Sequence, residues 1–548
     1  MNVSFSPFAR VLMRMIIVVV LATVFTALCV STSKQKGRLS SSPNYDDVVY
    51  FNEGAILLQA TRSQGLDGVR SHLNTYGLHS PFSTGLAAAA YAILGPDETS
   101  PYYADALLVM AYLGCIAWLG RHLRPAVWLA MLLLALSLPF ITMGVVEFRP
   151  DIAWATVTGF GVVFMVTRDE LFRRPGQAVV AGIFIALALL IKPSTFVMTV
   201  LLFTGATVSR FVPAWRERRL LSRQALRGVL FFGVTVLVVA GPYWLRFGKP
   251  AWNYFFLNSF GDRKSIWVYP GSLHDSLFYY ISGEAFASNL GGPGLVMIAL
   301  TLAATLCLLI KNPRSRWPIL SLTALVTGAL LINTVAQMKT PFLGGGIYGI
   351  FIFSGFYLIG ETWRMLTAGK PPRAAAMAEM GLLSSVAIAV ILLYQWPRYS
   401  DWSPSGLAAR NANYRNATNF INDVLTRNES SPPRNVMVLQ AGPIVPQVVS
   451  LWFPLHGLKG VVKSGAFTKD SATFTRIYPD FEWVIIQEQG VLGNTHNLPA
   501  EALLPRFLEI LKADPDYRPI AEFLSSDQRK VWVYARPPNA KPAKTASP

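Results

Sequence analysis

Long apolar runs alternate with short polar gaps through the first four hundred residues of this 548-residue chain. Backbone groups in lipid must be satisfied within their own segment, so runs that approach the width of a hydrocarbon core, about 30 Å, indicate helices. The pattern predicts eleven membrane helices, at residues 11–31, 102–120, 125–146, 152–167, 177–191, 194–209, 228–246, 291–310, 317–334, 346–363 and 377–396. The two segments separated by Lys192-Pro193 can also be read as one broken helix.

Basic residues are distributed unevenly between the gaps. Alternate gaps carry several arginines or lysines each, with six arginines between residues 210 and 227, whereas the short gaps on the opposite side contain single basic residues, Arg149, Lys192 and Lys339. Cytoplasmic loops of membrane proteins carry such an excess. With the N-terminus inside, this bias places the first long loop (32–101) and the C-terminal part outside.

The last 150 residues lose the apolar pattern and predict a soluble α/β domain. Residues 407–426 and 500–512 have helical spacing, whereas 435–439, 483–486 and 531–534 are short β-rich runs. The expected organisation is a membrane domain over 1–396, an outer α/β domain over 397–536 and a disordered tail over 537–548.

Composition supports a polytopic membrane protein, since 52% of the residues are hydrophobic and 14% are charged. The net charge of +18 comes largely from loop residues, and no basic-aromatic module predicts a nucleic-acid partner. Cys29, Cys115 and Cys307 lie in apolar runs without metal or disulfide spacing, which predicts buried thiols. Arg10 and Arg14 precede the first apolar run as in a signal peptide, but no good cleavage site follows, which favours an uncleaved anchor.

An acidic stretch follows the first apolar run. Asp46 and Asp47 suit the first turn of a helix, where carboxylates stabilise the helix dipole. Asp46, Tyr50 and Glu53 are also spaced to share one helical face. Two carboxylates and a phenol on one face suit abstraction of a proton from a hydroxyl. Both interpretations remain open from the residues alone.

Four further polar motifs fall on the predicted outer side. His79 precedes Ser-Pro and is either a loop residue or a substrate contact; Arg149 and Asp151 begin a span and either pair with neighbouring charges or bind substrate. Lys192 lies between apolar segments, where an ammonium usually faces a cavity or a partner. Lys339 precedes a glycine-rich loop. Cations at this depth suit the phosphate of a lipid-linked substrate.

The order of these motifs resembles the GT-C superfamily of polytopic glycosyltransferases, in the branch of the protein O-mannosyltransferases and the lipid A aminoarabinose transferase. The similar stretches are Tyr45-Asp46-Asp47-Val48-Val49-Tyr50, His79-Ser80-Pro81-Phe82, Ala87–Gly95, Lys192-Pro193 and Lys339-Thr340-Pro341. Asp47 stands where that branch often has Glu, and Ser80-Pro81 stands where two prolines are usual. The first change keeps the carboxylate.

The resemblance implies an inverting transfer of a hexose or pentose from a polyprenyl-phosphate donor to a hydroxyl of a lipid, glycan or protein. Asp46 would be the general base, with Asp47 or Glu53 orienting the acceptor. Lys192, Lys339 and Arg149 would bind the departing phosphate, while Tyr50, His79 and Asp151 are candidate substrate contacts. Such a leaving group does not strictly need a metal; a divalent ion is the alternative.

Two other functions stay open. A transporter or lipid flippase would show repeated hydropathy halves, which are not evident. A non-catalytic envelope assembly protein has no need of acids and lysines at one depth. A bacterial inner membrane is the expected location, although Asn416-Ala417-Thr418 and Asn428-Glu429-Ser430 match the glycosylation pattern of the endoplasmic reticulum.

The basic bias predicts the topology. A cysteine at Ser525 should react with a membrane-impermeant maleimide added outside intact cells, and a cysteine at Ser222 should react only after the membrane is opened. The unsubstituted chain, whose cysteines lie in apolar runs, is the control. The reverse labelling pattern would contradict the predicted orientation.

Overall fold

The computed structural model describes residues 6–41, 43, 46–76, 80–216, 222–261, 268–367, 379–389, 405–439, 444, 446–488, 499–524 and 529–537. His79, Ser525, the predicted boundary at 397 and all but the first residue of the predicted tail lie outside these ranges. The chain forms two compact units. The helical unit comprises residues 1–31, 76–83 and 102–399, and the α/β unit comprises 32–75, 84–101 and 400–548.

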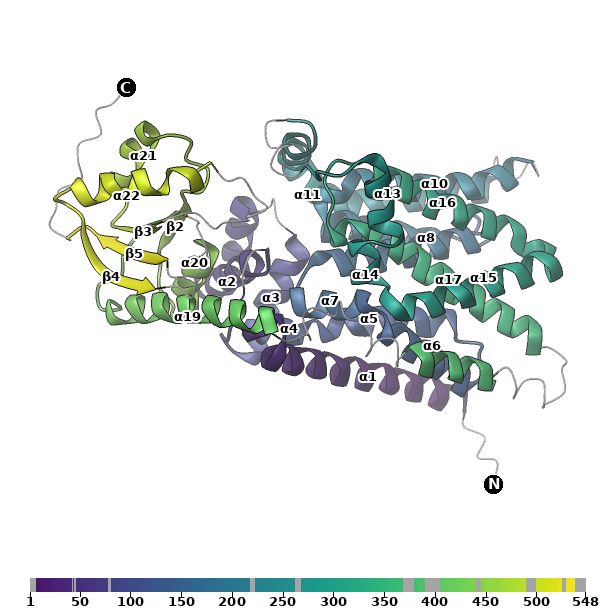
Figure 1. Cartoon of the computed structure of the whole chain (residues 1–548). Helices are drawn as coiled ribbons and strands as arrows, with labels where there is room; N and C mark the ends of the chain where they lie inside the picture. Colours follow the sequence, from purple (N-terminus) through teal and green to yellow (C-terminus); the bar gives the residue numbers. More distant parts are fainter. Residues whose placement is uncertain are drawn as a thin grey trace. The chain divides into compact units, whose positions relative to one another are not determined.

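The helical unit is built from apolar helices that lie alongside one another (Figure 1). They are α1 (Pro7–Lys36, which extends into the other unit), α4 (Ser100–Ala104), α5 (Ala106–Leu119), α6 (Pro125–Ser137), α7 (Pro139–Glu147), α8 (Pro150–Thr167), α9 (Pro175–Ile191), η2 (Pro193–Thr195), α10 (Phe196–Arg216), α11 (Arg223–Ser259), α13 (Leu273–Ile281), α14 (Glu284–Asn289), α15 (Gly291–Lys311), η3 (Pro313–Ser315), α16 (Arg316–Val335), η4 (Pro341–Gly344) and α17 (Gly345–Thr367). Another apolar helix covers Glu379–Ala389.

Each of the eleven predicted segments coincides with a helix or a pair of helices. Within the described residues, eight helices are long and apolar enough to cross a membrane, or nine if the bent pair α6 and α7 counts as one span. Pro139 breaks that pair, whose halves meet at 56°. The predicted segments at 177–191 and 377–396 correspond to shorter apolar helices, and the second is described only over Glu379–Ala389.

Proline begins several of these helices. Pro125, Pro139, Pro150 and Pro175 stand at the first helical position of α6, α7, α8 and α9. A proline fits there because that position has no partner for an amide hydrogen. Pro150 and Pro193 therefore set where α8 and the helix after Lys192 begin, and both places carry predicted site residues.

The buried helix α8 packs closely against α17. A side chain added at Gly159 would approach the carbonyl group of Gly349 to 2.4 Å, so these two backbones meet without side chains between them. Such close contacts between small residues are a usual means of packing membrane helices. The contact continues to the helix starts, where a Cβ at Gly345 would lie 3.5 Å from the carbonyl oxygen of Asp151.

In the α/β unit, the first loop forms a short turn and two helices. The turn is η1 (Arg38–Ser40), and the helices are α2 (Asp46–Tyr76) and α3 (Pro81–Leu94). α2 begins at Asp46, as the acidic pair predicts for the first turn of a helix, and Gly65 interrupts it with φ +58°, a backbone angle that favours glycine. The two helices pack closely, since a Cβ at Gly54 would lie 2.7 Å from that of Ala87.

The remainder of this unit is a five-stranded sheet with helices on both faces (Figure 1). The strands are β1 (Asn435–Val438), β2 (Val461–Ser464), β3 (Trp483–Gln487), β4 (Arg518–Leu524) and β5 (Lys530–Ala535), in the order β2-β1-β3-β5-β4. β2, β1 and β3 are parallel, whereas β5 pairs antiparallel with β3 and β4. The helical elements are α19 (Ser405–Arg427), α20 (Pro446–Leu455), α21 (Ser471–Ile477), η5 (Tyr478–Asp480), η6 (Glu501–Leu503) and α22 (Leu504–Ala513).

Successive residues of a strand point to opposite faces of the sheet, so each face has its own hydrophobic core. Val436 and Val438 pack with apolar residues of α19 and α20, whereas Met437 faces Phe474 and Phe507 from α21 and α22. The three predicted strands and both predicted helices are present. β2 and β4 were not predicted, because these edge strands expose most of their residues and lack a continuous apolar run.

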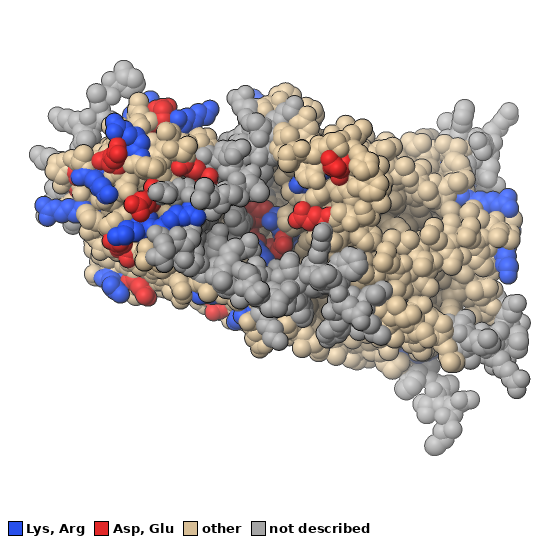
Figure 2. Space-filling view, in the orientation of Figure 1, with Lys and Arg blue, Asp and Glu red and all other residues tan. Residues whose placement is uncertain are grey.

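Charge is distributed differently on the two surfaces. Figure 2 shows acidic and basic side chains mixed over the α/β unit, while much of the visible surface of the helical unit carries no charge. Large apolar side chains are exposed there, including Leu237, Val238 and Leu306 at 58% exposure or more. Such a surface suits a hydrocarbon solvent.

Candidate active site

The two adjacent aspartates at the start of α2 have different surroundings. Asp46 is exposed, whereas the side chain of Asp47 is fully buried and forms an ion pair with Arg38 at 2.5 Å. Arg38 belongs to the η1 turn and is 17% exposed. Asp47 is therefore held by a neighbouring cation, whereas the side chain of Asp46 is accessible to solvent.

Glu53 lies two turns further along α2 and is nearly buried. Its Oε2 accepts a hydrogen bond from the Thr84 hydroxyl at 2.9 Å. Burial raises the pKa of Glu53 from 4.5 to about 7, and the Thr84 hydrogen bond opposes this change. A carboxyl group with a pKa near neutrality exchanges its proton readily under physiological conditions. Tyr50 lies between these residues along the helix and is half-buried.

In the helical unit, Lys192 forms an ion pair with Asp151. Their side chains are 13% and 5% exposed, so both charges are largely removed from solvent. Lys192 follows the last residue of α9 and Asp151 lies in the first turn of α8. An ammonium between apolar segments was expected to face a cavity or a partner. Lys192 has a partner, Asp151, which was itself a candidate substrate contact.

A strained turn between α7 and α8 presents Glu147 and Arg149. Phe148 has φ +45°, a left-handed backbone conformation that costs about 1–3 kcal/mol in a residue with a side chain. Its ring is buried and makes an edge contact with Tyr102. The residues on either side of Phe148, Glu147 and Arg149, form an ion pair at 2.8 Å. The guanidinium of Arg149 also lies 3.5 Å from the centre of the Phe342 ring.

Lys339 covers the C-terminal end of α16. Its ammonium donates hydrogen bonds to the carbonyl oxygens of Asn333 (2.7 Å), Thr334 (3.0 Å) and Ala336. Burial lowers the pKa of Lys339 from 10.5 to about 8. A lysine commonly caps a helix end in this way. To bind a phosphate, Lys339 would have to exchange some of these carbonyl partners.

Four of the five predicted motifs fall in the helical unit, and several are in contact. The Ser80 hydroxyl, next to His79 in the chain, donates to the carbonyl oxygen of Ile191, which precedes Lys192. Arg149 contacts Phe342 from the Lys339 loop. His79 itself lies outside the described residues. Asp46, Asp47, Tyr50 and Glu53 belong to the other unit.

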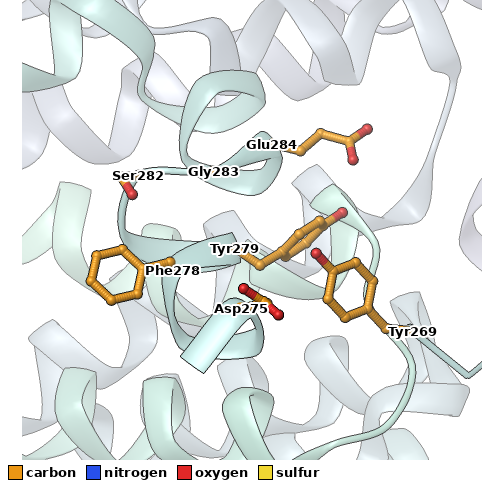
Figure 3. Close-up of a pocket in the computed structure, with 7 residues that line it drawn as sticks. All are labelled: Tyr269, Asp275, Phe278, Tyr279, Ser282, Gly283 and Glu284. Atoms are coloured by element: carbon orange, nitrogen blue, oxygen red, sulfur yellow. The ribbon is translucent and has the colours of Figure 1, made fainter. Parts of the chain in front are cut away.

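An open cavity of about 350 Å³ lies beside α13 and α14 (Figure 3). It is lined by Tyr269, Asp275, Phe278, Tyr279, Ser282, Gly283 and Glu284. Asp275 accepts hydrogen bonds from the backbone and hydroxyl of Ser272, which lower its pKa and cap α13. Two carboxylates and no cation line this cavity, so it does not suit a phosphate.

Among the described residues, no group of three or more His, Cys, Asp or Glu side chains is placed to hold a metal ion. The polar contacts of the predicted site are instead ion pairs and hydrogen bonds to carbonyl groups.

Arg38 is a site residue that the sequence did not reveal. It lies nine residues before its partner Asp47, with a loop between them. No signal in the sequence distinguishes it, because the same predicted outer loop also contains Lys34, Lys36, Arg62 and Arg70.

Comparison with known proteins identifies the fold. No protein-family model matches the sequence, and a search of curated proteins gives no significant match. Among solved structures, ArnT from Cupriavidus metallidurans in the apo state superposes with a TM-score of 0.59 at 14% identity, over 94% of this chain and 97% of that chain. The chain has the fold of ArnT. The structure of ArnT bound to undecaprenyl phosphate gives a TM-score of 0.55 at 15% identity, over 97% and 99%.

This likeness confirms the predicted fold class. ArnT is a lipid A aminoarabinose transferase of the GT-C type, the branch to which the sequence motifs were compared. The chain therefore has an ArnT-like fold, with several apolar helices that are long enough to cross a membrane and a C-terminal α/β region. Because the ArnT match covers nearly the whole chain, it includes both compact units. The roles of the individual site residues stay predictions.

The Lys192–Asp151 pair predicts a double-mutant result. Lys192→Met should lower the free energy of unfolding by about 3–5 kcal/mol, because Asp151 is left buried without its partner. Adding Asp151→Asn should recover much of that loss. Thermal unfolding in detergent measures both, with Lys311→Met at an exposed helix end as the control. A Lys192→Met protein as stable as the wild type would contradict the pairing.

Glu53 predicts a pH-dependent difference in stability. Its pKa is higher in the folded chain, so folding binds a proton between pH 4.5 and about 7, and stability falls as the pH rises through that window. In Glu53→Gln, the amide oxygen can still accept the hydrogen bond from the Thr84 hydroxyl. The variant has no carboxyl group to ionise there, so it does not lose stability as the pH rises through that window. The free energy of unfolding of the variant should therefore exceed that of the wild type by up to roughly 3 kcal/mol at pH 8, and by less at pH 5.

Melting temperatures at the two pH values test this prediction. Glu509→Gln, at an exposed glutamate on α22, is the matched control and should show no such difference. An equal effect of Glu53→Gln at pH 5 and pH 8 would mean that Glu53 is ionised in the folded protein throughout this range.

Proposed function

We propose that this protein is a membrane glycosyltransferase that transfers a sugar from a polyprenyl-phosphate donor to an acceptor hydroxyl on the extracytoplasmic side. The main support is the likeness to ArnT over nearly the whole chain, together with the ArnT structure that holds undecaprenyl phosphate. The order of acidic and basic motifs along the chain agrees with that assignment.

In the proposed reaction, the carboxylate of Asp46 removes the proton of the acceptor hydroxyl. The acceptor oxygen attacks the anomeric carbon of the sugar as the bond from that carbon to the phosphate oxygen breaks. The polyprenyl phosphate leaves with the bonding electrons, and the anomeric configuration inverts. The exposure of Asp46 supports this role, since a general base must reach the proton it removes. Asp47, held by Arg38, or Glu53 orients the acceptor.

Cations stabilise the negative charge that develops on the departing phosphate. Lys192 is the best placed for this role, because an ammonium has three N–H donors and its pair with Asp151 uses one. Arg149, which pairs with Glu147 through Nε, is the second proposed cation. Lys339 binds the phosphate only after it leaves its carbonyl partners.

Tyr50, His79 and Asp151 remain proposed substrate contacts, and Asp151 also holds Lys192. No resident metal takes part in this scheme. A divalent ion is the alternative source of positive charge, and transfer that is lost with a chelator and restored by adding the ion would favour it.

The proposed location is a bacterial inner membrane, with the α/β region on the periplasmic side. The donor is embedded in the membrane, so surrounding lipid is part of the substrate environment, and the acceptor is a lipid, a glycan or a protein. A transporter of the same lipid, or a non-catalytic assembly protein, would bind the donor without breaking its sugar–phosphate bond.

The proposed base predicts different behaviour for the two aspartates. Asp46→Asn should lower the transfer rate by about 10²–10⁴-fold, because the amide cannot accept the proton. Donor binding and melting temperature should stay close to wild type. Asp47→Asn should reduce the rate less but lower the melting temperature, because Arg38 loses its charged partner.

Transfer rate, donor affinity and melting temperature of both variants provide the test. Asp67→Asn, at an exposed aspartate on the same helix, is the control and should be indistinguishable from wild type. An Asp46→Asn enzyme with full activity would reduce the acidic pair to a helix start, since Asn caps a helix about as well as Asp.

A further inference from the structure

Arg415 links the C-terminal part of the chain to the first loop. It lies on α19, and its guanidinium forms an ion pair with Glu98. Its Nε donates to the carbonyl oxygen of Ser40 at 3.3 Å and its Nη2 to that of Leu39 at 3.5 Å. One side chain on α19 thus contacts two segments that precede it by more than three hundred residues in the sequence, and all three segments belong to one compact unit.

The carbonyl groups that Arg415 contacts follow directly after Arg38. The η1 turn is also held from its other side, because the Leu39 amide donates to the Ser33 hydroxyl at 3.1 Å. The hydroxyl of Ser41 donates to the carbonyl oxygen of Arg38 at 2.9 Å. The backbone that carries the Arg38 side chain therefore has few alternative positions while Arg415 is in place.

Glu98 lies in a turn that is itself well ordered by hydrogen bonds. Asp97 accepts from the backbone amide of Thr99 at 2.8 Å, and the Ser100 hydroxyl donates to the Gly95 carbonyl oxygen at 2.9 Å. A carboxylate held in this turn fixes one branch of the Arg415 fork. The other branches then point at the η1 carbonyl groups, a planar arrangement that lysine cannot reproduce.

We propose that Arg415 is a positioning residue for the transfer reaction: it fixes η1, η1 fixes Arg38, and Arg38 sets Asp47 at the start of α2. The helix start that carries Asp46 is then held from the C-terminal α/β region. This inference rests on the proposed function. It gives that region a role in the chemistry without contact with the reacting atoms.

The first test measures order rather than activity. Hydrogen exchange of the backbone amides at residues 38–41 should become at least several-fold faster in Arg415→Gln than in wild type. Arg415→Lys should give an intermediate rate, since it keeps the charge near Glu98 but loses the fork. Arg427→Gln, at an exposed arginine on the same helix, is the control. Unchanged exchange at these amides in both Arg415 variants overturns the proposal, whatever the protein transfers.

The second test separates positioning from a general structural effect. Arg415→Gln should lower kcat by about tenfold and leave KM for the donor within about twofold. In an Asp47→Asn background, the same substitution should add less than about twofold, because residues that act through one another are not additive. A full tenfold loss in that background overturns the proposed route through Asp47. If Arg415→Gln fails to fold, Arg415→Lys is used in the same cycle.

Failure of the Arg415 proposal can be distinguished from failure of the proposed function. A wild-type protein that transfers no sugar in the presence of donor and acceptor overturns the glycosyltransferase assignment. In that case the exchange measurement still decides whether Arg415 holds η1. Normal transfer with additive losses overturns only the role of Arg415.

Discussion

A buried charge must have a partner, and in the helical unit the pair of Lys192 with Asp151 meets this requirement and links two helix ends. The pair joins the break after α9 to the first turn of α8. α8 is in turn fixed by close backbone packing on α17. The same neighbourhood includes the strained turn at Phe148 and the contact between Arg149 and Phe342. Loss of either partner would leave an uncompensated charge in apolar surroundings, so the pair defines where these helix ends can lie.

The same requirement distinguishes the two neighbouring aspartates of the first loop. Asp47 is buried and held by Arg38, while Asp46 is exposed one residue earlier in the helix. Identical side chains thus have different surroundings, which is the basis for proposing different roles for them. Glu53 adds a third environment, in which burial raises its pKa to about 7. The first loop thus offers three carboxyl groups with separate properties within two helical turns.

Features that depend on local pattern could be predicted from the sequence. The eleven apolar segments and three buried strands follow from the periodicity of apolar residues, and the rarity of charges in apolar runs drew attention to Lys192. Long-range partners could not be predicted, because nothing local links Lys192 to Asp151 or Arg415 to Glu98. The edge strands β2 and β4 were missed since exposed strands carry no apolar run. The hydrogen bonds of Lys339 to the α16 carbonyl groups could not be predicted either, and its binding of phosphate stays a prediction.

The central claim is that the protein breaks a sugar–phosphate bond. The most direct measurement places the purified protein in lipid vesicles with undecaprenyl phosphate that carries a labelled sugar, and adds an extract of envelope lipids and glycans as acceptor. The label should move from the donor to the extract, with undecaprenyl phosphate released in equal amount. A donor that crosses the bilayer or binds the protein while its sugar–phosphate bond stays intact would contradict the claim and favour transport or assembly.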